Sequence, residues 1–224
     1  MQVTGSGIVQ TVPDIAVLDI YLRGEGPAPD DATTMIAAKQ KAVTDGLRGF
    51  LGSDSELTAS NVVIIEARAS SCADARGYGS QPRLSTGDCA VSGFIATMQL
   101  RVRTRAVGKS ATAAGLASRL GASDARVQGF ALSDPEAAQA RANAAAIAVA
   151  GRRAAALASG AGLRLGSIVT VRDQAGYDGT ALTASLAREY VVAPPMVRSP
   201  MVIALKPTPI ETRAQVLVTY AIAP

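Results

Sequence analysis

Apolar residues recur along this chain with two different periods, and each period predicts one type of secondary structure. A period of two predicts strands at residues 3–9, 15–23, 61–68, 91–104, 125–132, 165–172 and 212–222. Spacings of three and four residues predict helices from Asp30 or Asp31 to about Leu51, from about Val107 to Leu120, and from Pro135 to about Ser159. Because strands and helices mix without a strict strand–helix–strand repeat, we predict an α+β fold. It has a largely antiparallel sheet with helices packed on one face.

Two of the predicted strands carry the clearest information about burial. Residues 15–22 are apolar on both faces apart from Asp19, which predicts a central strand that is covered on both sides. Asp19 is then either a buried carboxylate with a partner or the mark of an edge or bulge. Residues 91–104 alternate, so one face is predicted to be buried, and it contains Phe94, Ala96, Met98, Leu100 and Val102.

The last predicted helix is long and rich in alanine. Ser133 and Glu136 fit a capping box, and Pro135 suits the first helical turn. The helix would be about 37 Å long at about 1.5 Å per residue, and Gly160 and Gly162 would end it. Its apolar positions are mostly alanine, so we expect it to approach a sheet or another helix closely.

We take residues 1–224 as a single domain with two irregular segments, a cysteine-bearing loop at 70–90 and a proline-rich apolar insertion at 174–211. Disordered segments normally have low hydrophobicity, whereas this insertion is rich in apolar residues. We therefore expect it either to cover the domain's own core or to extend into a neighbouring subunit. The candidate oligomer-interface residues in it are Tyr190, Val191, Val192, Met196, Val197, Met201, Val202 and Ile203.

The composition excludes much hydrolytic and metal chemistry. The chain has no histidine and two cysteines, so it cannot form a Ser-His-Asp triad, a Cys-His dyad, an imidazole zinc site or a four-thiolate site. The net charge is +4, but Arg101, Arg103 and Arg105 are the densest basic cluster, and they alternate as one solvated strand face. We expect no nucleic-acid partner. No apolar stretch reaches about 18 residues, so we expect no transmembrane segment.

The short motifs that resemble ligand sites fail on spacing. Gly5-Ser6-Gly7 starts like a dinucleotide fingerprint, but Gln10 stands where the third glycine would be. Gly108-Lys109-Ser110 resembles the end of a phosphate loop, but Arg103 stands where the leading glycine would be, so we expect the first turn of a helix. Neither a G-x-S-x-G elbow nor an S-x-x-K motif occurs. We therefore predict no catalytic, cofactor-binding or metal-binding residues.

Cys72 and Cys89 lie in one loop rich in glycine, serine and aspartate. An even pair that flanks a loop indicates a disulfide if the compartment is oxidising. The alternative is two free thiols in a reducing compartment. A redox-active pair is disfavoured because the spacing is not C-x-x-C and no lysine stands beside either thiol.

Several segments resemble the SIMPL-domain family, which includes YggE-like oxidative-stress proteins and a periplasmic immunogenic protein. The segments Val3–Gly7 and Val12–Ala16 match the family's N-terminal "G-x-G … P-D-x-A" pattern, and Val127–Pro135 is similar to its second signature. Residues 207–211 and 216–220 match its closing strand. After Ile210-Glu211 the chain departs from the family, with Thr212-Arg213 in place of the usual Pro-Gly.

The resemblance implies an exported, periplasmic bacterial protein whose export signal is absent from this sequence. It also implies a homo-oligomer, ring-like or channel-like in some members, with a role in protection against oxidative or envelope stress. The family offers no catalytic residues, so we expect a non-enzymatic protein without cofactors, and an envelope protein or peptide is the candidate partner. The alternative is a module that binds a small apolar ligand or an envelope peptide under the proline-rich insertion.

Overall fold

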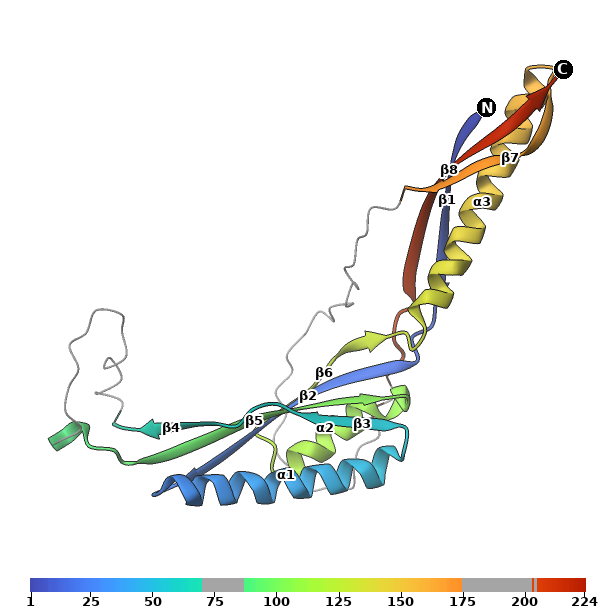
Figure 1. Cartoon of the computed structure of the whole chain (residues 1–224). Coiled ribbons are helices and arrows are strands. Elements are labelled where there is room, and N and C mark those ends of the chain that lie inside the picture. The colour runs from blue at the N-terminus through green and yellow to red at the C-terminus, as the bar shows by residue number, and fades with distance from the viewer. Residues whose placement is uncertain (70–86, 175–202, 204) are drawn as a thin grey trace. The chain divides into compact units, whose positions relative to one another are not determined.

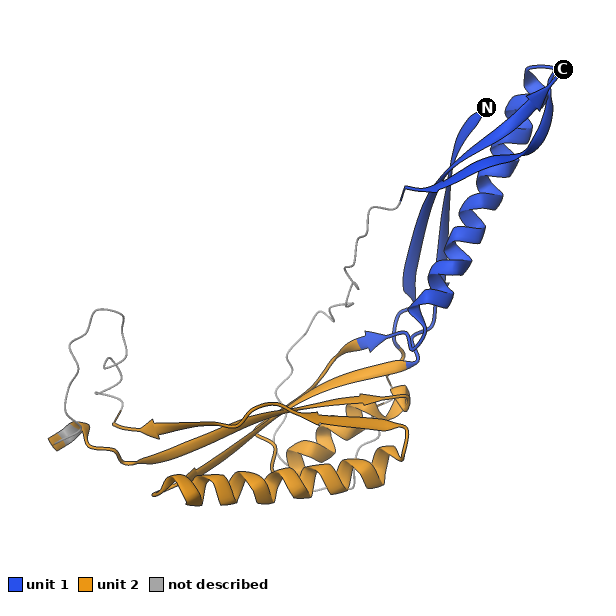
Figure 2. Ribbon diagram, in the orientation of Figure 1, with its two compact units in different colours: residues 1–14, 130–187, 207–224 blue, residues 15–129, 188–206 orange. Residues whose placement is uncertain are grey.

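The computed structural model describes residues 1–69, 87–174, 203 and 205–224 (Figure 1). The chain divides into two compact units, which Figure 2 shows in different colours. Unit 1 comprises residues 1–14, 130–187 and 207–224, and unit 2 comprises residues 15–129 and 188–206. The sequence predicts a single domain over residues 1–224, and the division into two units within it comes from contacts between segments that are distant in sequence.

Unit 1 is a three-stranded antiparallel sheet with one long helix packed on it (Figure 1). β8 (Ile210–Ala223) lies between the edge strands β1 (Gln2–Thr11) and β7 (Arg164–Asp173). α3 (Pro135–Gly160) packs along β1 and β8 on one face of this sheet. The chain thus brings its first and last strands together as neighbours.

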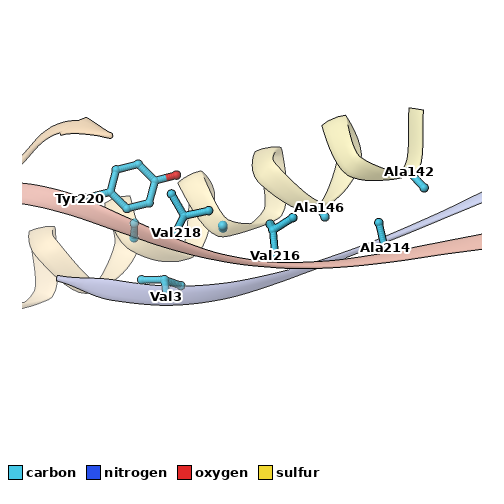
Figure 3. Close-up of a cluster of buried hydrophobic side chains, with 9 residues drawn as sticks. Val3, Ala142, Ala146, Ala214, Val216, Val218 and Tyr220 are labelled. Carbon is cyan, nitrogen blue, oxygen red and sulfur yellow. The ribbon is translucent and has the colours of Figure 1, made fainter. Parts of the chain in front are cut away.

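The buried side of α3 is a stripe of alanines spaced four residues apart, namely Ala138, Ala142, Ala146, Ala150, Ala154 and Ala158. This spacing follows one ridge of the helix surface. The stripe packs on Val3, Val216, Val218 and Tyr220 of the sheet (Figure 3). The close approach that the sequence predicts for this helix is confirmed.

The Gly5-Ser6-Gly7 segment allows this approach from the side of the strand. A Cβ on Gly5 would lie 2.1 Å from the carbonyl oxygen of Ala146, and a Cβ on Gly7 would lie 2.2 Å from that of Ala142. Both distances are far shorter than any van der Waals contact, so only glycine lets β1 meet the backbone of α3. The segment that fails as a dinucleotide motif therefore has a packing role.

The start of α3 differs in detail from the sequence prediction. Asp134 caps the helix, since its Oδ1 accepts the N–H of Ala137 at 2.8 Å. Ser133 instead donates its N–H to Oδ1 of Asp14 at 2.7 Å and its hydroxyl to the other oxygen of that carboxylate. The predicted capping box of Ser133 and Glu136 is therefore wrong, because the serine joins the chain segment before α3 to the turn that follows β1.

Unit 2 is a second antiparallel sheet with two helices on one face (Figure 1). β2 (Ile15–Gly26) lies between β5 (Gly93–Thr104) and β6 (Asp124–Ala131). α1 (Pro29–Leu51) packs on β2 and β5, and α2 (Ser110–Arg119) packs on β2 after the 3-10 turn η3 (Val107–Lys109). The Gly108-Lys109-Ser110 segment thus leads into a helix, as predicted.

Alternate residues of β2 and β5 form the core of unit 2. The buried face of β5 carries Ala96, Met98, Leu100 and Val102, which confirms the predicted alternation, whereas Phe94 of the predicted face is only half-buried. The helix face of β2 and the inner side of α1 complete this core with Ala16, Leu18, Ile20, Leu22, Ile36, Val43 and Leu47. A Cβ on Gly24 of β2 would lie 2.3 Å from the carbonyl oxygen of Ala32 in α1, so glycine again permits strand–helix contact.

The first helix starts slightly earlier than the sequence predicts. Its N-cap is Ala28 and its first residue is Pro29, while the Asp31 carboxylate accepts the N–H of Ala28 at 3.2 Å. The prediction that Asp30 or Asp31 caps this helix is therefore wrong. Pro29 suits the first helical position because its missing N–H would have no partner there.

Two further strands lie on the same edge of β5. β3 (Ser55–Ala59) pairs with its second half, where Leu57 is opposite Val102. β4 (Val63–Ala67) pairs with its first half, where Ile65 is opposite Ile95. The sequence predicts β4 but misses β3, because residues 55–59 contain one large apolar residue and no alternation.

The predicted fold class is confirmed in both units. Each unit is an antiparallel sheet with helical cover on one face, and α3 is the long alanine-rich helix.

Candidate interaction surface

The described surface offers few features that bind ligands. Within the described ranges, no three His, Cys, Asp or Glu side chains lie close enough to hold a metal ion. Among the helices of the described part of the chain, none is both long and apolar enough to cross a membrane. The features that need an explanation are instead two exposed apolar strands at sheet edges.

The first of these is the β4 edge, which we define as residues Val62–Ala67. β4 pairs with β5 on one side and with no described strand on the other. Its four consecutive β-branched residues are exposed by 41, 54, 45 and 37% from Val62 to Ile65. An unpaired strand of this composition is a template for pairing with another strand.

The exposed side chains of the β4 edge point to both faces of the sheet. Val63 and Ile65 lie opposite Thr97 and Ile95, on the face away from the helices. Ile64 lies opposite Ala96, on the face that the helices cover elsewhere. A strand that is apolar on both faces is normally covered on both sides, yet the described residues leave side chains on each face of β4 partly exposed.

The second feature is the β7 edge in unit 1, which we define as residues Arg164–Asp173. β7 pairs with β8 and with no other described strand, and Ile168, Val169 and Val171 are 47, 61 and 46% exposed. The pairing with β8 is irregular between Leu165 and Thr170 and regular from Thr170 to Asp173. Among the described strands, each unit therefore has a regular segment whose outer edge is open.

The opposite edge of unit 1 is better protected. Arg153 of α3 donates to the carbonyl oxygen of Thr4 at 2.9 Å, and Arg141 donates to Oγ1 of Thr11 at 2.9 Å. The backbone carbonyl of Thr4 is thus already bonded to a charged side chain of the covering helix, and such cover of an edge strand discourages pairing with other chains. Side chains of α3 thus bond to β1 but not, in any described contact, to β7. This difference indicates that β7 is the edge that can pair with another strand.

The open face of the unit 2 sheet holds charged side chains that already have partners. Asp19 is 3% exposed, and its Oδ1 accepts the Nε–H of Arg101 at 3.1 Å, which confirms a buried, partnered carboxylate. Arg126 stacks on the ring of Tyr21 at 5.2 Å and donates to its hydroxyl at 3.1 Å. Only Nε of Arg126 is buried without a hydrogen-bond partner among the described side chains. Arg101 and Arg103 are exposed on this face, as predicted.

The interface residues predicted from sequence lie almost entirely outside the described residues. Tyr190, Val191, Val192, Met196, Val197, Met201 and Val202 belong to that group, so their role stays a prediction. Ile203 is described: it is 49% exposed, and its N–H donates to Oγ1 of Thr112 in α2 at 3.3 Å. The apolar-ligand site predicted under this segment also stays a prediction.

Sequence reasoning did not single out either edge strand. The run Val62-Val63-Ile64-Ile65 is visible in the sequence, but such a run is typical of a strand covered on both faces. Its position at an edge depends on β5, which lies about thirty residues further along the chain. The usable signal is that the run contains no lysine, proline or charge that would block pairing.

The cysteine loop is described only at its ends. Cys89 ends the 3-10 turn η2 (Gly87–Cys89), and its carbonyl accepts a hydrogen bond from Arg68 at 2.5 Å. Cys72 lies outside the described residues, so the Cys72–Cys89 disulfide stays a prediction.

We expect reduction to lower the melting temperature of the oxidised protein. Closing a loop of this length stabilises a fold by about 3 kcal/mol in the chain-entropy model. Thermal unfolding with and without dithiothreitol, followed by circular dichroism, measures the effect, and the double variant Cys72→Ala/Cys89→Ala is the control because it should not respond. An unchanged melting temperature on reduction would show that no stabilising disulfide is present.

These features define an α+β protein of two units with exposed apolar strand edges. The chain belongs to the SIMPL family, described as a protein of unknown function (DUF541), whose profile matches residues 1–220. The match covers both units and confirms the resemblance seen in the N-terminal and closing segments.

Other comparisons add little. No curated protein matches the chain. One similar solved structure is an amidase of the hydantoinase/carbamoylase family from Burkholderia phymatum, with 12% identity and a TM-score of 0.32. The match covers 55% of this chain and 32% of that chain. A likeness this low transfers nothing from that enzyme.

Proposed function

We propose that this chain is a non-enzymatic protein of the bacterial envelope that self-assembles into homo-oligomers. The observation that carries the proposal is the β4 edge, where Val62 to Ile65 are 37 to 54% exposed on a strand without a second described partner. A long apolar edge left open in a monomer invites aggregation. Pairing between copies covers it in a defined way.

The sequence of the β4 edge supports pairing with a strand of another copy. Edge strands of monomers usually carry lysine, proline, a bulge or an inward charge. The run from Val62 to Ile65 has none of these, and Glu66 beside it is already bonded to Arg68. Covering these β-branched side chains would be favourable by roughly 25 cal/mol for each Å² of apolar surface removed from water.

The envelope location and the stress role in this proposal are supported by the family and not by the strand edges. Membership of the SIMPL family supports both, since the family resemblance implies export and protection against oxidative or envelope stress. The even pair of cysteines in one loop agrees with this location, because such pairs are typical of proteins in oxidising compartments. We propose no catalytic activity because the sequence has no nucleophile–base motif.

Light scattering coupled to size-exclusion chromatography tests the self-assembly. At micromolar concentration we expect a mass of several copies, and Ile64→Lys should shift the population towards the monomer because a charge on the strand resists burial at an interface. Ile8→Lys is the matched control, since Ile8 is a strand isoleucine that is 58% exposed on β1. A wild-type chain that remains monomeric would overturn the proposal.

A further inference from the structure

We infer, on the basis of the self-assembly proposed above, that the β4 edge of one copy pairs in parallel with the β7 edge of the next copy. The occupant of each edge is therefore a second copy of this chain. Each chain carries both edges, and they belong to different units. Both combine exposed β-branched side chains with an edge that pairs with no second strand among those the structure describes.

Charge favours pairing between unlike edges over pairing between like edges. Within the β4 edge Glu66 is the one charged residue, which gives this edge a net charge of −1. The β7 edge has Arg164 and Arg172 against Asp173, a net charge of +1. Two β4 edges would repel each other, as would two β7 edges, whereas β4 and β7 attract.

The positions of the charges select the parallel register. Val63–Ala67 and Val169–Asp173 are each five residues long, and the second range contains the regular end of β7. Aligned in parallel, they place Val63 beside Val169, Ile65 beside Val171 and Glu66 beside Arg172. The apolar side chains and the opposite charges then coincide in a single register.

The antiparallel registers that bring Glu66 beside an arginine of β7 fit less well. Placing Glu66 beside Arg172 would set Ile65 beside the carboxylate of Asp173. Placing Glu66 beside Arg164 would set Ile64 and Val63 beside Gly166 and Ser167, in the irregular part of β7. That register leaves Arg172 far from Glu66. It loses both the regular hydrogen-bonding edge and the apolar match.

A contact between unlike edges is heterologous, because each copy offers a different strand to each of its neighbours. Such a contact repeats until the copies close into a ring or grow into a filament. The β1 edge does not compete, since arginines of α3 bond to Thr4 and Thr11 there.

Charge reversal tests this pairing in the full-length chain. Glu66→Arg and Arg172→Glu should each raise the concentration for half-assembly about 5- to 10-fold, because each puts like charges side by side. An equal mixture of the two variants should assemble like the wild type when their copies alternate. In each contact of the mixture one copy then supplies an arginine and its neighbour a glutamate. The arginine lies on β4 in one contact and on β7 in the next. Rescue on mixing also excludes pairing within one chain.

The matched controls reverse the same kinds of charge outside the proposed contact, on β3 and at the irregular end of β7. Glu56→Arg and Arg164→Glu should move the half-assembly concentration less than about twofold. Residues 56 and 164 lie outside the proposed β4–β7 contact, and salt screens their charges over that distance. Melting curves confirm that all four variants fold. If the wild type assembles but mixing restores nothing, the β4–β7 pairing is wrong while self-assembly stands. A monomeric wild type overturns both.

Discussion

Replacing Gly5 with alanine is expected to destabilise unit 1 by about 3 kcal/mol. The added Cβ would lie 2.1 Å from the carbonyl oxygen of Ala146 and 2.7 Å from the backbone nitrogen of Ala150. Both neighbours are helix backbone, so no side chain can rotate away to make room. β1 and α3 must separate, and the packing of the alanine stripe on the sheet is lost.

Chemical denaturation followed by circular dichroism measures this effect. Gly115→Ala is the matched control, because Gly115 lies inside α2 and a Cβ there meets nothing within 4 Å. In a helix, alanine is favoured over glycine by about 1 kcal/mol, so the control should be neutral or more stable. Equal losses in the two variants would contradict the proposed role of Gly5.

Replacing Ala150 with leucine is expected to destabilise unit 1 by about 3 kcal/mol. Ala150 is fully buried, and its Cβ faces Gly5 across the gap between helix and strand. The longer side chain has no space there, because the strand opposite has no side chain that could give way. The helix must shift away from β1 to accept it.

Ala148→Leu is the control for this second substitution. Ala148 lies two residues away on the exposed side of α3. Leucine and alanine differ by only a few tenths of a kcal/mol in helix propensity, so the free energy of unfolding should change by less than about 0.5 kcal/mol. A large loss at Ala148 would show instead that the outer side of α3 is packed.

The assembly proposed above gives the two units separate tasks. Unit 2 offers the β4 edge and unit 1 offers the β7 edge, so each copy needs both units to join two neighbours. The packing variants at Gly5 and Ala150 act on unit 1, so they should also weaken assembly through β7.

Local signals in the sequence predict much of the secondary structure. They place α3 from Pro135 to about Ser159, and it is observed at Pro135–Gly160, because proline at its start and glycine at its end act within one turn. They also predict the buried face of β5, since alternation is a property of neighbouring residues. They miss β3 because its strand conformation depends on pairing with β5 rather than on its own residues.

The candidate surface is much harder to predict. The run from Val62 to Ile65 is the same in the sequence whether it lies at the centre or at the edge of a sheet. Only the pairing of β4 with β5 on one side shows that it is an edge. The predicted interface around Tyr190 rests on composition alone and awaits a test of assembly.

The amino-acid sequence alone is enough for the fold class, the family and the positions of the long helix and most strands, because periodicity and helix-end signals act over a few residues. The three-dimensional fold was needed to learn which alanines of α3 are buried, why Gly5 and Gly7 are glycine, and which strands are left at edges. These features depend on residues far apart in the chain: Gly5 meets Ala146, and β1 pairs with β8. Spacing within one segment carries no information about what lies across from it.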